Sequence, residues 1–316
     1  MTPHQHTLGT PYVVGPVHCY STTIADDLVL FDTGPPTQET QDYLTEHLDL
    51  KRLRHVIITH CHIDHYGLAH WLEQHSDATV YLPFRDHLKI IRHQERLEKM
   101  RDLLLTYGFT ADFLAQFKDS MADGTVFPTL PERYRVIEEG LPEHLGIEVI
   151  PCPGHSQSDL VLARDNWAVT GDVLLRGIFQ SPLLDVDLLS GERFRNYDAY
   201  CATLLQLAGL RDRQILPGHR YSIESVDANI CFYIAKLLER SARVMRIDPD
   251  RPIAEVAQGL FSDSPGHPFA IYLKASELVF IRDFLAAPQL LRQALEKIGL
   301  YPQLAEQFNT SLTAAK

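Results

Sequence analysis

The segment Val56-Ile57-Ile58-Thr59-His60-Cys61-His62-Ile63-Asp64-His65 joins an apolar run directly to four potential metal ligands. Alternate residues of an extended segment project to the same side, so His60, His62 and Asp64 can converge on one point. Imidazole and carboxylate groups together suit zinc, iron and related ions. The segment therefore predicts a metal site at the end of a buried strand.

Three more segments have the same form, an apolar run that ends in a histidine or an aspartate: Val149–His155, Trp167–Asp172 and Gln214–His219. With the first segment they supply seven candidate ligands. A carboxylate can join two cations, and a bend after His62 would let Asp64 and His65 face a second ion about 3.5 to 4 Å from the first. The four segments together favour a two-metal centre.

The run His-x-His-x-Asp-His, followed in order by a separate His, an Asp and a final His, resembles the ligand pattern of metallo-β-lactamase-fold hydrolases. The resemblance covers about residues 10 to 222. It implies two divalent metal ions, zinc first with iron and manganese as alternatives. It further implies the following partition of ligands: His60, His62 and His155 on the first metal, Asp64, His65 and His219 on the second, and Asp172 bridging the two.

The fold that this resemblance implies is an α/β sandwich of the αββα type, with two sheets face to face and helices outside. With 316 residues, one main domain with additions is expected. We assign residues 1–222 to the catalytic domain, with a helical insertion at about 84–140, and residues 223–316 to an all-helical C-terminal extension. Relatives use such C-terminal helices to complete the pocket or to form a homodimer, and the sequence leaves both roles open.

Periodicity and turn residues locate the other elements. The Asp32-Thr33-Gly34 turn resembles the family's Asp-Thr-Gly segment, and Asp32 is expected to be structural, bonding donors of that turn. Strands are expected at 11–14, 17–24, 28–31, 55–59, 78–82, 160–163, 167–170 and 215–216. Helices are expected at 38–48, 65–75, 88–107, 111–118, 197–207, 229–243, 253–260, 269–285 and 290–298.

The helical insertion is hypothesised to be a lid over the substrate pocket, because it falls between the first ligand segment and His155. Its aromatic residues support a lid: Phe109, Phe113, Phe117 and Phe127. The alternative is a helical pair that only packs on the core or makes a dimer contact.

Composition limits the class of protein. Lys and Arg number 29 against 41 Asp and Glu, a net charge of −12, which argues against a nucleic-acid partner. The N-terminus lacks the charge and apolar stretch of a secretory signal, and no apolar run approaches the roughly 20 residues of a membrane span. A cytoplasmic location is the default expectation. The five cysteines are odd in number and form no Cys-x-x-Cys pair, so the sequence does not predict a fold held together by disulfide bonds.

The resemblance implies a hydrolase acting on a small-molecule substrate. A hydroxide shared by two metal ions would cleave an ester, thioester or lactone bond, and Asp64 and Asp172 are the catalytic carboxylates, Asp64 also orienting the nucleophile. No further cofactor-binding residues are expected. Tyr66 and Tyr221 follow candidate ligands and are expected to be packing residues; the alternative is that each donates a hydrogen bond to a developing oxyanion. Ser156 is expected to cap a turn.

Glyoxalase II, which cleaves a glutathione thioester, is similar in its ligand set, its C-terminal helices and, loosely, in the segment Pro217–Tyr221. The long separation between His65 and His155 departs from that compact enzyme.

Other functions stay open. A phosphodiesterase or ribonuclease on the same centre would need a basic groove, for which the dense candidates are Lys89, Arg92, Arg96, Lys99 and Arg101. These alternate with acidic residues, as on a solvated helix face. A non-catalytic metal-binding regulatory protein is a further alternative. Oxygen or nitric-oxide chemistry at a di-iron centre would need an electron carrier, and antibiotic hydrolysis would need export.

Overall fold

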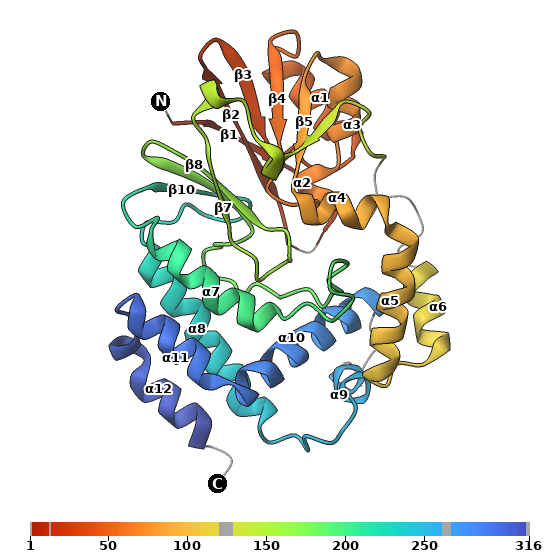
Figure 1. Cartoon of the computed structure of the whole chain (residues 1–316), viewed down its shortest axis with the longest axis vertical. Helices are drawn as coiled ribbons and strands as arrows, with labels where there is room; N and C mark the ends of the chain where they lie inside the picture. Colours follow the sequence, from red (N-terminus) through yellow and green to blue (C-terminus); the bar gives the residue numbers. More distant parts are fainter. Residues whose placement is uncertain (1, 13, 120–128, 261–266, 314–316) are drawn as a thin grey trace.

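The computed structural model describes residues 2–12, 14–119, 129–260 and 267–313. Two sheets pack face to face between layers of helices (Figure 1). The larger sheet has the order β1-β2-β3-β4-β5-β6: His4–Leu8, Val17–Ile24, Asp27–Phe31, Leu53–Ile57, Thr79–Leu82 and Tyr134–Val136. The smaller sheet has the order β10-β9-β8-β7: Gln214–Pro217, Trp167–Gly171, Leu160–Arg164 and Glu148–Pro151. The predicted αββα sandwich of the α/β class is confirmed.

The parallel strands of each sheet have their carboxyl ends at one edge of that sheet. Strands β1, β2 and β3 are antiparallel, whereas β3, β4, β5 and β6 run parallel. In the second sheet β9 and β10 are parallel neighbours. Ala25 and Asp26 connect β2 to β3 with positive φ angles of 48° and 76°, the conformation of a tight hairpin turn. Loops that follow β3, β4, β9 and β10 can therefore meet.

Apolar residues on the facing sides of the two sheets form the central core. Phe31 and Trp167 meet edge to face with ring centroids 5.5 Å apart, and Ile57 and Leu162 are buried in the same cluster. Helices α1 (Gln38–His47), α2 (Ile63–Tyr66) and α3 (Ala69–His75) cover the outer face of the larger sheet. Helices α7 (Asn196–Ala208) and α8 (Val226–Val244) cover the smaller one.

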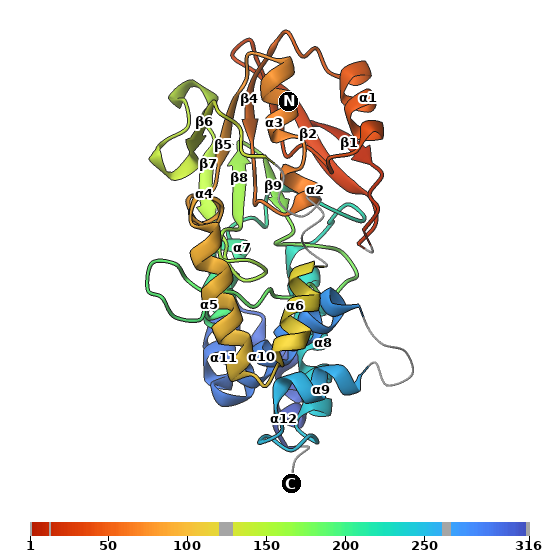
Figure 2. The same ribbon diagram turned by 90° about the vertical axis from the view of Figure 1, so that its right-hand side faces the viewer.

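The inserted helices share a core with the C-terminal helices. Helices α4 (Phe84–Ile91), α5 (His93–Thr106) and α6 (Ala111–Asp119) leave the sandwich, and Figure 2 shows α5 and α6 extending toward α9 (Ile253–Gly259) and α10 (Pro268–Ala286). Phe109 and Phe113 are buried in this shared core, and the ring of Phe117 contacts Tyr272. These aromatic residues therefore bind the insertion to the C-terminal extension. Phe127 lies outside the described residues.

Three elements are misplaced in, or missing from, the sequence prediction, and one long predicted helix is interrupted. The strand expected at 11–14 is wrong: Val13 lies outside the described residues, and the others form a turn in which Gly15 donates to the Tyr12 carbonyl. Gly15 has a φ of 89°, and two neighbouring prolines lack the N–H that a strand needs. The strand is His4–Leu8 instead, where only alternate positions are apolar or buried.

The other two differences are a strand and a helix that the sequence did not indicate. Strand β6 lies within the segment expected to be helical and pairs with β5. Helix α12 (Tyr301–Thr313) follows α11 (Pro288–Lys297), beyond the predicted last helix. The helix expected at 88–107 is divided at Arg92, which is not helical.

Within the described residues, no helix has the length and apolar character to cross a membrane.

The buried His6 makes the stability of this fold depend on pH. Burial, with His4 and His47 nearby, lowers its pKa to about 4. Between these pKa values the native state binds fewer protons than the unfolded chain. The contribution of neutral His6 to the free energy of unfolding is therefore complete above pH 6.5 and is lost as the pH falls toward 4. The His6 contribution should fall by about 1 kcal/mol per pH unit in that window. Urea unfolding at pH 8, 6 and 4.5 gives the free energy of unfolding of the wild type and of His6→Gln. If the difference between the two proteins were the same at all three pH values, the prediction would be wrong.

Candidate metal centre

The seven side chains that the sequence predicts as ligands lie together at the edge where the strand ends meet. The segment after β4 supplies four of them, and the loops after β7, β9 and β10 supply one each. They form two adjoining groups. The first group contains His60, His62, His155 and Asp172, and the second contains Asp64, His65 and His219.

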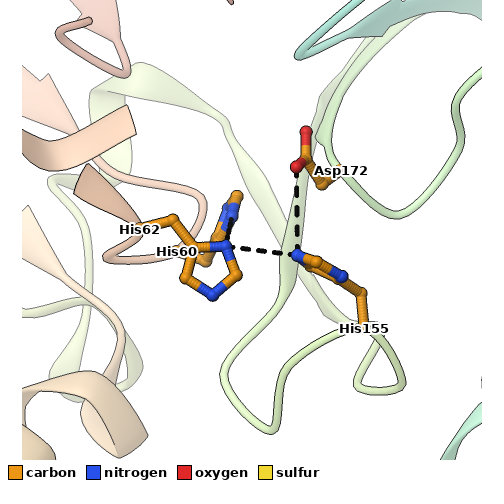
Figure 3. A group of neighbouring side chains, drawn as sticks. All are labelled: His60, His62, His155 and Asp172. Carbon is orange, nitrogen blue, oxygen red and sulfur yellow. Dashed lines mark hydrogen bonds and ion pairs between the residues drawn. The ribbon is translucent and has the colours of Figure 1, made fainter. Parts of the chain in front are cut away.

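The donor atoms of the first group converge (Figure 3). His62 Nδ1 lies 2.8 Å from His60 Nε2 and 3.2 Å from His155 Nε2. Asp172 Oδ2 lies 3.9 Å from His155 Nε2. Nitrogen ligands at 2.0–2.1 Å around a tetrahedral zinc ion are about 3.3 Å apart. The spacing of the three imidazoles therefore fits one ion.

The second group has similar spacing and shares Asp172 with the first. His219 Nε2 lies 3.3 Å from His65 Nε2 and 3.2 Å from Asp64 Oδ2. Asp172 Oδ1 lies 3.3 Å from His65 Nε2 and 3.6 Å from His219 Nε2. One oxygen of Asp172 thus faces each group, the position that a bridging carboxylate requires.

Hydrogen bonds behind the imidazoles orient them toward the centre of the site. Three rings each place Nδ1 against an oxygen that can only accept: His65 on Asp32 Oδ2 at 2.8 Å, His155 on the Ser181 carbonyl at 2.7 Å, and His219 on the Pro16 carbonyl at 2.8 Å. Each Nδ1 must therefore carry the proton, which leaves the Nε2 lone pair free for a metal.

Asp32 organises this outer layer, although its role differs from the expected one. Its Oδ1 accepts from the Thr59 backbone N–H at 2.8 Å, and its Oδ2 accepts from the Thr59 hydroxyl at 2.9 Å. The same Oδ2 accepts from His65. The carboxylate thus bonds the first ligand segment and one ligand, not the donors of its own turn. Its φ of 58° is one of the few positive values at a residue other than glycine.

The charge distribution also suits cations. Burial lowers the pKa of His60 well below its ordinary value and that of His62 to about 3, so both rings are neutral, the form in which an imidazole can bind a metal. Burial alone would lower the pKa of His65 too, but Asp172, Asp32 and Asp64 raise it well above its ordinary value. Among the described residues, no group makes a hydrogen bond of good geometry to the buried Asp172 Oδ1, although His65 Nε2 lies 3.3 Å away. Three carboxylates around one imidazole need positive charge, and divalent ions would supply it.

Two glycines let the ligand segments approach closely. A Cβ at Gly218 would lie 2.6 Å from His65 Cε1 and 2.8 Å from Asp172 Oδ1. A Cβ at Gly171 would lie 2.5 Å from the Thr59 hydroxyl oxygen, and its φ is 48°. Each glycine directly precedes a ligand, so backbone packs against the site where a side chain would not fit.

Sequence reasoning missed a buried network that braces the first group. Asp86 lies on α4 and accepts two hydrogen bonds, each 2.5 Å long. One comes from the backbone N–H of Cys61, which stands between His60 and His62 in the sequence, and the other comes from the Ser158 hydroxyl. Lys89 Nζ lies 3.0 Å from Asp86 and 3.4 Å from Asp185.

Further contacts extend this network to the loop after Asp172. Arg96 binds both oxygens of Asp185, which also accepts from Gln157. The carbonyl of Ser181, in that loop, is the one that holds His155. The only sequence signal was Asp86 and Lys89 one helical turn apart, which is equally typical of an exposed ion pair.

The remaining expected residues lie at the margin of the site. The Tyr66 hydroxyl donates to the Thr129 carbonyl at 3.4 Å inside the core, whereas Tyr221 is 72% exposed. Ser156 bonds Asp159 through both its backbone N–H and its hydroxyl, as the cap of a turn does. All five cysteines lie in the described part of the chain and are free.

The sequence and the fold are both similar to those of known proteins. A family model described as the metallo-beta-lactamase superfamily matches residues 12–219. The probable metallo-hydrolase YqjP of Bacillus subtilis (strain 168) is 27% identical over 276 residues, 80% of this chain and 82% of that protein. The probable metallo-hydrolase YflN of the same organism is 27% identical over 210 residues, 60% of this chain and 74% of that protein.

Two solved structures share the fold. A metallo-beta-lactamase family protein from Thermus thermophilus superposes with a TM-score of 0.68 at 21% identity, covering 89% of this chain and 93% of its own. A beta-lactamase domain protein from Burkholderia ambifaria superposes with a TM-score of 0.69 at 19% identity, covering 91% of this chain and 86% of its own.

The Asp86 network gives a prediction that separates metal binding from stability. Asp86→Ala removes the nearer of the two carboxylates that pair with Lys89, and it also removes the hydrogen-bond acceptor of the Cys61 backbone N–H. It should lower the free energy of unfolding by about 3 kcal/mol and metal affinity about 10- to 100-fold. Adding Lys89→Met should recover much of the stability but not the affinity, because the N–H is still unpartnered. Urea unfolding and competition with a chelator measure the two quantities. Recovery of both in the double variant would show that Asp86 has no positioning role.

Proposed function

The chain belongs to the metallo-beta-lactamase superfamily, and on that premise we propose that it is a metal-dependent hydrolase that cleaves an ester, thioester or lactone bond. The observation that carries this proposal is the pair of adjoining ligand groups that share Asp172. The probable metallo-hydrolases of Bacillus subtilis support hydrolysis as the reaction class.

Two divalent ions in these groups would supply a water of lowered pKa and a Lewis acid for the carbonyl oxygen. The side chains of the protein then have distinct roles. Asp172 holds the two groups at a fixed separation, because its two oxygens face different histidines. Asp64 lies beside His219 and supplies an acceptor that can orient the attacking water. The outer contacts of Asp32 keep His65 from rotating away.

Water is the proposed nucleophile because the side chains beside the centre are otherwise engaged. The Ser156 hydroxyl donates to Asp159 at 2.8 Å and is buried. The Tyr66 hydroxyl points to the Thr129 carbonyl, within a hydrophobic cluster. A covalent mechanism would require a nucleophile next to a general base, and neither hydroxyl has a histidine as its hydrogen-bond partner among the described residues.

The basic residues of the insertion favour a carbonyl substrate over a phosphodiester. Lys89 and Arg96 are largely buried and paired with Asp86 and Asp185. The more exposed Arg92 and Arg101 pair with their neighbours Glu95 and Asp102. A nucleic acid needs several cations free to neutralise phosphates, and these four are already neutralised by carboxylates. We therefore rank ribonuclease or phosphodiesterase activity second.

The test is hydrolysis of a glutathione thioester by the metal-loaded protein. Asp172→Ala removes the shared carboxylate and should lower kcat/KM about 100-fold or more, since the stabilisation at stake is several kcal/mol. Thioester cleavage is followed by the release of free thiol. A simple lactone and bis(p-nitrophenyl) phosphate are assayed in parallel, because they separate the proposed bond classes from phosphodiesters.

The matched control is Asp77→Ala, which removes a carboxylate whose side chain is 80% exposed and which belongs to neither ligand group. It should hydrolyse the preferred substrate at the wild-type rate. Turnover of the phosphodiester alone would overturn the proposed bond class, and equal turnover by Asp172→Ala with the same metal content would overturn the role of Asp172.

A further inference from the structure

We propose that Asp27, His55 and His144 form a separate binding site for one divalent transition-metal ion, at the end of the sandwich opposite the candidate metal centre. The donors come from three elements that are distant in the sequence. Asp27 begins β3, His55 lies in β4, and His144 lies in the 3₁₀ turn Glu143–Leu145. One donor atom from each residue lies within 4.8 Å of the others.

The two sites are well separated along the strands. Asp27 precedes Asp32 by five residues in and just after β3, and His55 precedes His60 by five residues in and just after β4. An extended strand advances about 3.3 Å per residue, so the two sites lie on the order of 16 Å apart. An ion at the second site would therefore not touch the seven ligands of the first.

Both imidazoles approach the same carboxylate oxygen. Asp27 Oδ2 lies 2.9 Å from His144 Nε2 and 3.3 Å from His55 Nε2. The imidazole rings have centroids 5.9 Å apart. Donors bound to one tetrahedral ion at about 2.0–2.2 Å are separated by about 3.3 Å. An ion would therefore fit among the three donors after small side-chain movements.

Tyr81 holds His55 in the orientation that a ligand needs. Its hydroxyl lies 3.3 Å from His55 Nδ1, on the side of the ring away from Asp27. A tyrosine hydroxyl can accept as well as donate. When an ion binds Nε2, the proton on His55 can therefore reside on Nδ1 and be donated to Tyr81, the arrangement typical of metal-bound histidines.

The surroundings favour neutral imidazole on the inner side of this site. Burial lowers the pKa of His55, although Asp27 partly offsets that effect. The two histidines lower the pKa of Asp27, His144 most of all, so the carboxylate is ionised. Two neutral imidazoles and one carboxylate are a donor set for Zn²⁺, Ni²⁺, Co²⁺ or Cu²⁺ rather than for Mg²⁺ or Ca²⁺. Water would complete the coordination on the side where His144 is exposed.

Such an ion would fasten a connecting segment to the larger sheet. The segment that contains His144 joins β6 to β7 and is held by the buried Leu145 and by Arg164, which donates to the Leu145 carbonyl at 2.9 Å. Asp27 and His55 belong to adjacent strands of the sheet. The ion would thus add a link between the larger sheet and the chain that enters the smaller one.

The experiment counts the metal equivalents bound by the full chain. Isothermal titration with Zn²⁺ at pH 7.5 is carried out on the wild type, on His144→Gln and on Asp27→Asn. Each variant should bind one equivalent fewer than the wild type, whatever number the candidate metal centre takes. Titration with Co²⁺ gives a second readout, since the variants should lose one component of the visible absorption. His144 is 47% exposed, so its replacement should leave the fold intact.

The matched control is His75→Gln, which removes an exposed histidine that belongs to none of the ligand groups. It should bind as many equivalents as the wild type. Equal stoichiometry in the wild type and His144→Gln would overturn the proposal. So would the loss of one equivalent in His75→Gln, because it would show binding to scattered surface histidines.

Discussion

Three carboxylates, Asp32, Asp64 and Asp172, surround the buried ring of His65, and this concentration of negative charge is the constraint on which the site depends. Unpaired charge in a protein interior is costly, so the arrangement can persist only with compensating positive charge. His65 can provide one such charge by protonation. Cations held by the imidazoles on both sides would provide more, and would leave His65 free to act as a ligand.

The architecture around this constraint assigns separate tasks to separate layers. The strands bring the ligands to one edge, and the outer hydrogen bonds of Asp32, Ser181 and Pro16 set the directions of the imidazoles. The inserted helices reach the first ligand segment from behind through Asp86. Those helices are in turn packed on α9 and α10. A continuous series of contacts thus connects the C-terminal helices, through the inserted helices, to the first ligand segment.

The clustering of the seven candidate ligands was predictable, because each segment that carries them follows an apolar strand, and both the strand and the residue types are local properties of the sequence. The αββα fold was expected from the family resemblance that the same segments carry. The brace of Asp86, Lys89 and Asp185 was not predictable, because Asp185 lies far along the chain from the other two and only tertiary packing buries all three. The strand at His4–Leu8 was missed because polar side chains hid an alternation in which only His6 and Leu8 are buried.

Gly171 and Gly218 have a consequence for how this centre can diverge. At both positions the space for a side chain is occupied by candidate ligands or by Thr59, so the candidate metal centre is lined there by backbone and leaves no room for a Cβ atom. Mutations that adapt the protein to larger or smaller substrates must therefore fall on the rim. The segment between Asp172 and α7 contacts both the insertion and α10. Changes there would disturb the centre least at positions other than Ser181 and Asp185, which support it.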